Sequence, residues 1–185
     1  LSDSEIAEHE FAQVGRRGRG RPARHYVATA RAHEKLSDSY SDLAVKALGY
    51  LGQVGGGEAI DSFAAARSRE IERRYASTVR EAGHDPRLRA QALADALTAD
   101  GYAATVRDIG GGGFAVQLCQ GHCPIRQVAG DFPQLCEAET AAFSRLLNVH
   151  VQRLATLAGG EHVCTTHIPV ATPVISPAAR AALRK

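Results

Sequence analysis

A change of hydrophobic period at Gly101 constrains the fold more than any other feature of this sequence. Before it, apolar side chains recur every three or four residues, as on one face of an α-helix. After it, Tyr102, Ala104 and Val106 alternate with other residues, which is typical of a strand with one buried face. The 185 residues therefore predict an α+β protein in which helices precede an antiparallel sheet.

Three amphipathic helices are predicted in the first part of the chain. The first should bury one stripe and end at Gly55–Gly57; its stripe is Leu36, Tyr40, Leu43, Ala47, Tyr50 and Val54. A longer stripe, which indicates pairing between subunits, runs along the second helix as Ile60, Ala64, Ile71, Tyr75 and Val79. Asp85 as N-cap and Pro86 after it begin the third, which should bury Leu88, Ala92, Leu93, Ala96 and Leu97.

Three hairpins and one more helix complete the expected elements. The first hairpin pairs residues 6–11 with 26–29, and the second turns at Gly110–Gly113 and delivers Cys119 at the end of a strand. A helix is predicted from Pro133 to Leu147. The last hairpin pairs residues 149–154 with 162–168, and residues 171–185 are expected to be a flexible tail.

Composition excludes several classes of protein. A hydrophobic content of 44% rules out a disordered chain. No run of about 18 apolar residues exists, and the first residues lack the pattern of a signal peptide, so we expect a soluble, cytoplasmic protein without membrane contact. The chain has no methionine, so we expect residues upstream of Leu1 to be missing. It also lacks phosphate-loop, nucleophile-elbow and paired-histidine motifs, which argues against an enzyme.

All four cysteines lie in the second half of the chain, with the spacing C-x3-C-x12-C-x27-C: Cys119, Cys123, Cys136 and Cys164. Without an export signal, such a grouping indicates metal or redox chemistry rather than structural disulfides. Both zinc and a four-iron cluster accept four thiolates. Structural zinc sites favour two close pairs, and only one pair is close here, which favours the cluster.

The spacing does not decide which side chains would be the metal ligands. His122 and His167 lie close to cysteines in sequence and are alternative ligands. Cys119 is also open to a second interpretation, as a small buried side chain that continues the inward alternation of Val116 and Leu118.

A glycine-rich segment between the first two predicted strands carries five arginines: Arg16, Arg17, Arg19, Arg21 and Arg24. No acidic residue lies between Gln13 and His33. Arginines on a narrow hairpin can grip phosphates and enter a minor groove, so this segment predicts DNA binding. A solvated basic loop and an RNA contact are the alternatives.

Two motifs together resemble one family. The run Gly-Arg-Gly-Arg-Pro-Ala-Arg-His-Tyr-Val resembles the wing of winged-helix bacterial repressors. The cysteine region, with His122-Cys123-Pro124, Cys136-Glu-Ala-Glu139 and Cys164-Thr-Thr-His167, resembles the actinobacterial form of the SufR family. Members of that family are iron-sulfur-binding repressors of the operon for cluster assembly, and the resemblance spans roughly residues 6 to 170.

The resemblance implies a winged helix-turn-helix part without its amino-terminal helices, joined by long dimerisation helices to a small α+β cluster-binding domain. The corresponding regions are 1–35, 36–84 and 85–170, with the tail at 171–185. It implies a homodimer that binds an inverted repeat in double-stranded DNA and represses suf genes, sensing iron and redox state through a [4Fe-4S] cluster.

Carried over by position, Cys123, Cys136 and Cys164 are the three cysteines of the family motif. The fourth ligand stays open among Cys119, the two histidines and a carboxylate. Two alternatives to the cluster remain, a structural zinc site and a metal-free thiol switch between Cys119 and Cys123.

Overall fold

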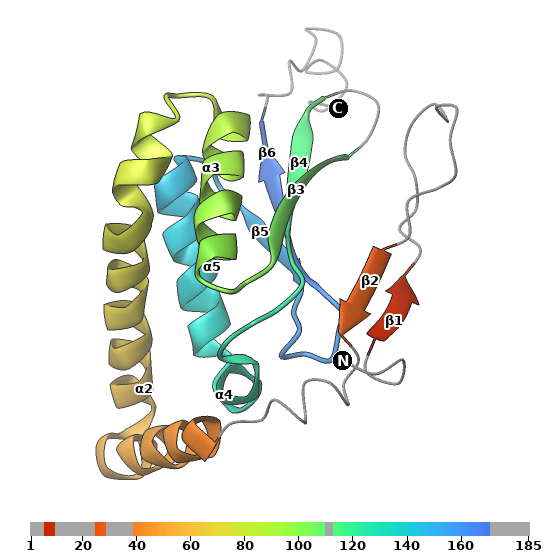
Figure 1. Cartoon of the computed structure of the whole chain (residues 1–185). Helices are drawn as coiled ribbons and strands as arrows, with labels where there is room; N and C mark the ends of the chain where they lie inside the picture. Colours follow the sequence, from red (N-terminus) through yellow and green to blue (C-terminus); the bar gives the residue numbers. More distant parts are fainter. Residues whose placement is uncertain (1–5, 10–24, 29–38, 110–112, 171–185) are drawn as a thin grey trace, which may run out of the picture.

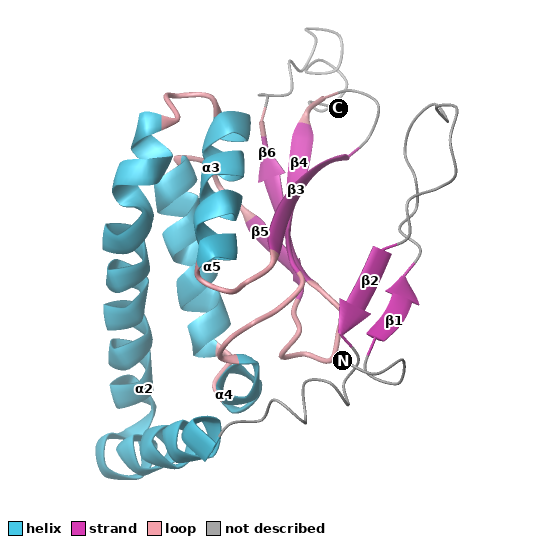
Figure 2. Cartoon of the chain, viewed as in Figure 1, coloured by secondary structure: helices cyan, strands magenta, loops and turns pink. Residues whose placement is uncertain are grey.

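A computed structural model describes residues 6–9, 25–28, 39–109 and 113–170. They form an α+β fold in which three helices lie on one face of a four-stranded antiparallel sheet (Figures 1 and 2). The predicted fold class is therefore confirmed at this level. Arg16, Arg17, Arg19, Arg21 and Arg24 lie outside the described residues, as does the segment 171–185.

The amino-terminal hairpin is present as predicted. Strands β1 (Ile6–His9) and β2 (His25–Ala28) pair antiparallel, with Ile6 opposite Ala28 and His9 opposite His25. Among the described residues no helix precedes α2, so the helix-turn-helix part stays a prediction.

Helix α2 (Ser39–Glu81) joins the first two predicted helices into one element. Gly56 kinks it, with φ 68° and ψ −172°, a backbone conformation that is essentially reserved for glycine. Two helical segments therefore meet at Gly56, within the glycine run at which the first helix was predicted to end.

The first half of α2 buries a different face from the predicted one. Leu48 is buried there, with Ala44, Val45 and Leu51 packed beside it. The predicted stripe is instead exposed, since Tyr40, Leu43, Tyr50 and Val54 keep between 63% and 76% of their surface accessible. The prediction was wrong because this helix is apolar on two faces, and periodicity does not say which one meets the rest of the chain.

The second half of α2 is buried along the predicted stripe, which consists of Ile60, Ala64, Ile71, Tyr75 and Val79. Its last three members share one core with α3, α5 and the sheet. This stripe packs within the chain, which corrects the prediction that it pairs subunits.

Helix α3 (Pro86–Ala99) begins as predicted, with Asp85 Oδ1 accepting a hydrogen bond from the Arg87 backbone nitrogen at 2.8 Å. Leu93 and Leu97 are buried with two alanines that the pattern did not include, Ala90 and Ala94. Leu88 is 55% exposed, so its predicted burial was wrong.

The sheet has the strand order β3-β4-β6-β5, and its neighbours are all antiparallel. Both predicted hairpins are confirmed, and their pairing through β4 and β6 makes one sheet. The strands are β3 (Ala104–Ile109), β4 (Ala115–Gln120), β5 (Gln152–Ala155) and β6 (Cys164–Pro169).

Two helices connect the halves of the sheet. Helix α5 (Gln134–Leu147) is confirmed, and Asn148 ends it in the left-handed conformation. The short helix α4 (Arg126–Asp131) was not predicted, because six residues are too few for a helical period. No helix in the described ranges is both long and apolar enough to cross a bilayer.

Candidate metal centre

Three separate segments deliver Cys123, Cys136 and Cys164 to one end of the sheet. Cys123 lies in the loop between β4 and α4, Cys136 in the first turn of α5, and Cys164 opens β6. None of the three forms a disulfide; Cys136 and Cys164 raise the pKa of Cys123, and Cys164 raises the pKa of Cys136, which places the three in one electrostatic neighbourhood. The structure thus brings together the three cysteines that the family resemblance singled out.

Cys119 is not part of this group. In β4, Cys119 is paired with Thr165, and its neighbour Gln120 is paired with Cys164. Since successive side chains of a strand point to opposite faces, Cys164 shares a face with Gln120 and Cys119 lies on the other. Gln120, and not Cys119, continues the inward alternation of Val116 and Leu118. Cys119 is buried, as its second interpretation predicted, but on the opposite face of the sheet.

Neither candidate histidine joins the three cysteines. His167 alternates with Thr166 and Ile168 on β6, so it lies on the same face as Cys119. The Nδ1 atom of His122 lies 2.7 Å from the carbonyl oxygen of Gly101, to which it donates. That contact fixes the ring against the end of α3.

Burial keeps the three thiols protonated in the absence of metal. It raises the pKa of Cys123 to about 12, with Glu139 and the other two thiols adding to the effect. It also raises the pKa of Cys136 and Cys164, where Arg153 acts in the opposite direction. A metal centre here must therefore displace three protons when it binds.

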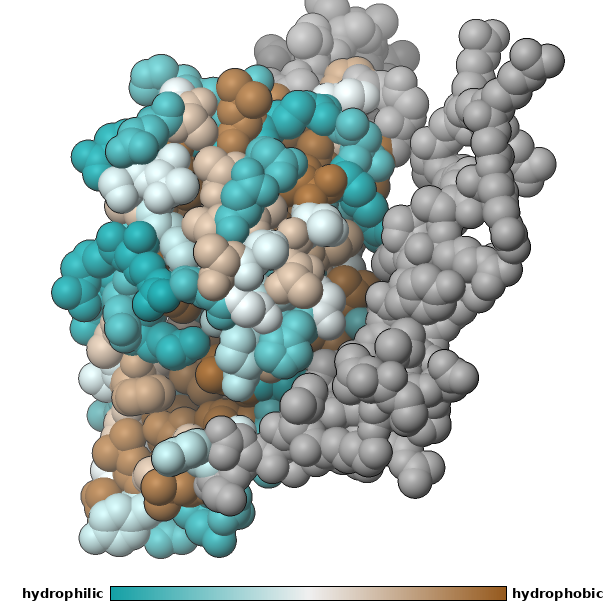
Figure 3. All heavy atoms as spheres, in the orientation of Figure 1, coloured by the Kyte–Doolittle hydropathy of each residue, from teal (hydrophilic) through white to brown (hydrophobic). Residues whose placement is uncertain are grey.

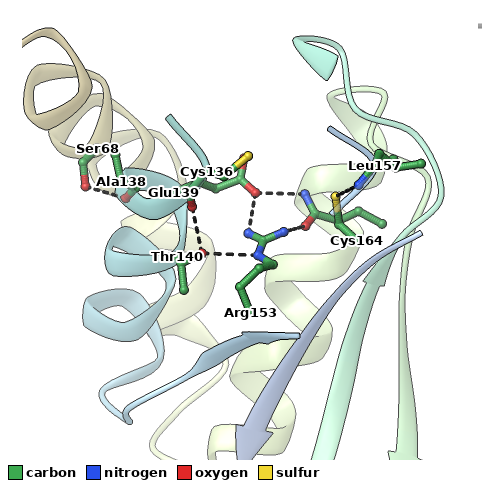
Figure 4. A network of polar contacts seen from close by, with 9 residues as sticks. Ser68, Cys136, Ala138, Glu139, Thr140, Arg153, Leu157 and Cys164 are labelled. Atoms are coloured by element: carbon green, nitrogen blue, oxygen red, sulfur yellow. Dashed lines mark hydrogen bonds and ion pairs between the residues drawn. The ribbon is translucent and has the colours of Figure 1, made fainter. Parts of the chain in front are cut away.

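Arg153 on β5 holds a polar network beside the sulfurs (Figure 4). Its guanidinium donates to Glu139 Oε1 and to Gln120 Oε1, both at 2.8 Å, and to Thr140 Oγ1 at 3.2 Å. It also lies over the ring of Phe143, 5.6 Å from the centroid. Although burial lowers it, the pKa of Arg153 is raised by Glu139 and by the nearby thiols.

Backbone N–H groups point at two of the sulfurs. The Leu157 nitrogen donates to Cys164 Sγ at 3.2 Å, and the backbone of Ile125 lowers the pKa of Cys123 through a similar bond. Hydrogen bonds to sulfur stabilise thiolates and tune the potential of iron-sulfur clusters. The donors are thus oriented for ligating sulfur.

A second arginine faces the centre from α2. The Nε atom of Arg67 is buried and has no hydrogen-bond partner among the described residues. Arg67 lies against Tyr102, whose pKa is raised to about 12 by burial and then by Glu139 nearby. An anionic group among these side chains would meet two cations, Arg67 and Arg153.

These observations fit a thiolate-ligated cluster. The donor set is soft and flanked by positive charge, with Cys164 buried and Cys123 and Cys136 partly buried, as suits an anionic cluster. Within the described ranges, no group of three or more His, Cys, Asp and Glu side chains is arranged to hold a metal ion, which favours neither a cluster nor zinc. A hollow of about 670 Å³ between α5 and β5 adjoins the site, and Cys136 and Arg153 line it.

The sequence analysis missed Glu139, Arg153 and Gln120 as members of the site. Glu139 was quoted only as part of the motif beginning at Cys136, although a spacing of three residues puts both on one face of a helix. Gln120 and Arg153 carry no sequence signal, because they reach the site only through the pairing of β4 and β5 with β6.

Comparison with known proteins adds no relative. No family model matches the chain, and no curated protein or solved structure matches it. The centre is therefore interpreted from its own geometry and chemistry.

Proposed function

We propose that this chain is a DNA-binding repressor of genes for iron-sulfur cluster assembly, of the kind found in the SufR family. Cys123, Cys136 and Cys164 would hold a [4Fe-4S] cluster that reports iron and redox state. The observation that carries the proposal is the convergence of these three thiols, from three segments, with two arginines beside them.

When bound, such a cluster supplies a centre that reacts with oxidants and nitric oxide and depends on iron supply. The protein contributes three thiolates, the N–H groups aimed at their sulfurs, and the charge of Arg153. Loss of ligation would free Cys123, Cys136 and Cys164 from one another and return their protons. The loop after β4, the start of α5 and the start of β6 would then be held only by their own packing.

Helix α5, which carries Cys136, packs against α2, as does α4, which follows Cys123. In sequence, α2 follows the arginine-rich segment proposed to bind DNA. Ser68 on α2 donates to the carbonyl oxygen of Ala138 at 2.9 Å, one residue from Glu139. Arg145 on α5 donates to Glu72 on α2 at 2.6 Å. A second apolar cluster joins the kinked part of α2 to α4 and α5; its buried members are Leu48, Ile60, Ala64, Val128 and Leu135.

This packing supports a route from the cysteines to DNA. A shift at the start of α5 or at α4 acts on both sides of the Gly56 kink, because Leu48 precedes it and Ile60 follows it. In a homodimer, a change in this kink would alter the spacing of two DNA-contacting hairpins. Binding to an inverted repeat requires that spacing to match half-sites about one helical turn apart.

The exposed stripe of α2 is the surface proposed for the dimer. Its members, Tyr40, Leu43, Tyr50 and Val54, are all exposed, and Figure 3 shows hydrophobic surface at the end of the molecule where α2 begins. Contiguous apolar surface of this kind marks interaction sites in soluble proteins. Helices that pair in this way are typical of two-fold symmetric regulators.

The test is anaerobic purification followed by iron and sulfide analysis and a visible spectrum. We expect about four irons and four sulfides per chain and a broad absorption near 400 nm. Binding to operator DNA is then compared between cluster-bound and apo protein, and equal affinities would remove the switch. Zinc in place of iron would support a structural site instead. A disulfide between Cys119 and Cys123, found by mass spectrometry, would support the thiol switch.

A further inference from the structure

We propose that Glu139 is the fourth ligand of the cluster and binds iron through Oε2. This inference rests on the proposed function and completes its ligand set. It concerns a residue that the spacing of the cysteines does not include.

Glu139 lies close to one of the proposed cysteine ligands and is buried, as a ligand of the cluster should be. It lies three residues after Cys136 on α5, so both side chains leave the same face of the helix, one turn apart. Only 7% of its surface is exposed. A carboxylate is almost never buried to this extent unless it is paired or ligating.

The hydrogen bonds of Glu139 leave one oxygen for a metal. Arg153 donates to Oε1 at 2.8 Å, and the amide of Gln120 donates to the same atom at 3.2 Å. Among the described residues, both bonds to this carboxylate end on Oε1. Oε2 therefore remains as a donor atom, while Arg153 and Gln120 hold the carboxylate by Oε1.

Glu139 is also the carboxylate that the three cysteines share. It raises the pKa of Cys123, Cys136 and Cys164, whereas the exposed Glu137 is a lesser cause of the raised pKa of Cys136. The close-up of this site shows the sulfurs of Cys136 and Cys164 on the side of the network where the Glu139 carboxylate lies (Figure 4).

The other candidates lie elsewhere. Cys119 and His167 are on the opposite face of the sheet. His122 is held through Nδ1 at the Gly101 carbonyl and, unlike Glu139, has no bond to the network around Arg153 among the described residues. Three thiolates and one carboxylate are thus the set that this end of the sheet supplies. The two arginines offset part of its negative charge.

Mössbauer spectroscopy of the full chain loaded with ⁵⁷Fe tests the proposal directly. In the wild-type protein, one iron in four should differ from the rest, because oxygen ligation changes its isomer shift. In the variant Glu139→Cys that difference should disappear. The matched control is Glu137→Cys, a carboxylate of the same helical turn, and it should keep the wild-type spectrum.

A second measurement covers the case in which Glu139→Cys fails to fold. Cys119→Ser should leave the unique iron and the iron content of the wild-type protein unchanged. Four equivalent irons in the wild-type protein would overturn the assignment, as would loss of the unique iron in Cys119→Ser. A wild-type protein without iron and sulfide would instead overturn the proposed function itself.

Discussion

At the scale of the residue, the centre is a set of groups whose ionisation is coupled. Three thiols and the Glu139 carboxylate lie around Arg153, and burial keeps the thiols protonated in the apo protein. The stability of the apo protein should therefore depend on pH, through the thiols, and on the ion pair between Arg153 and Glu139.

Alkaline pH should destabilise the apo protein through Cys123. Burial raises its pKa from 9.0 to about 12, so the folded state keeps a proton that the unfolded state has lost. Stability is complete below pH 9 and falls as the pH rises toward 12, by about 1 kcal/mol at pH 10 for this thiol. Urea unfolding at pH 8 and pH 10 measures the loss, and Cys123→Ala should reduce it. An equal loss in that variant would contradict the assignment.

Replacing Arg153 should lower the free energy of unfolding more than the loss of a surface ion pair does. Its side chain and that of Glu139 are only 11% and 9% exposed, so Arg153→Met leaves a buried carboxylate without its cation. We expect the free energy of unfolding of the apo protein to fall by about 3–5 kcal/mol. The double variant Arg153→Met/Glu139→Gln removes both charges and should recover part of this loss. A single variant within about 1 kcal/mol of wild type would show that the pair contributes little.

At the scale of the element, the kink in α2 decides which parts of the chain can touch. Gly56 lets the helix turn so that Leu48, before the kink, packs in the same cluster as Ile60 after it. A straight helix would separate these residues by about 18 Å along its axis.

Gly56→Ala should therefore destabilise the protein. The φ of 68° with an extended ψ is strained for any residue with a Cβ, at a cost of about 1–3 kcal/mol. The control is Gly49→Ala in the same helix, where an added Cβ meets no atom within 4 Å. That variant should gain about 0.5–1 kcal/mol from helix propensity. Thermal unfolding of both compares them, and a stabilising Gly56→Ala would mean that the kink is not required.

At the scale of the whole molecule, the described residues leave an apolar stripe exposed on the first half of α2. The stripe on the second half packs against the rest of the chain, so we propose the first half as the surface for a partner. The surface predicted to form the dimer is therefore the first half of α2 instead of the second half.

Charge in that stripe should disrupt the dimer. The double variant Leu43→Glu/Tyr50→Glu places two carboxylates on the exposed face, and we expect it to be monomeric at concentrations where the wild-type protein is dimeric. Leu88→Glu is the control, since Leu88 is similarly exposed but lies on α3. Analytical ultracentrifugation distinguishes the two forms. A wild-type monomer, or a dimeric double variant, would show that the stripe serves another purpose.

The elements of this fold could be predicted from the sequence because their signals are local. The period change at Gly101, the Asp85 and Pro86 start of α3, and the alternation in β3 and β4 each depend on residues close in the chain. The faces were harder to predict. The exposure of Leu88 and of the α2 stripe depends on neighbours that are distant in sequence.

The sequence by itself determined the α+β class and the order of the elements other than α4, since those signals are local. Spacing made all four cysteines candidates, and the family resemblance singled out three of them. Only the tertiary structure decided that Cys119 lies apart and that Glu139, Gln120 and Arg153 stand beside the other three. The physical reason is the pleat of the sheet. A shift of one residue moves a side chain to the opposite face, and only the pairing of β4 with β6 shows which face meets α5.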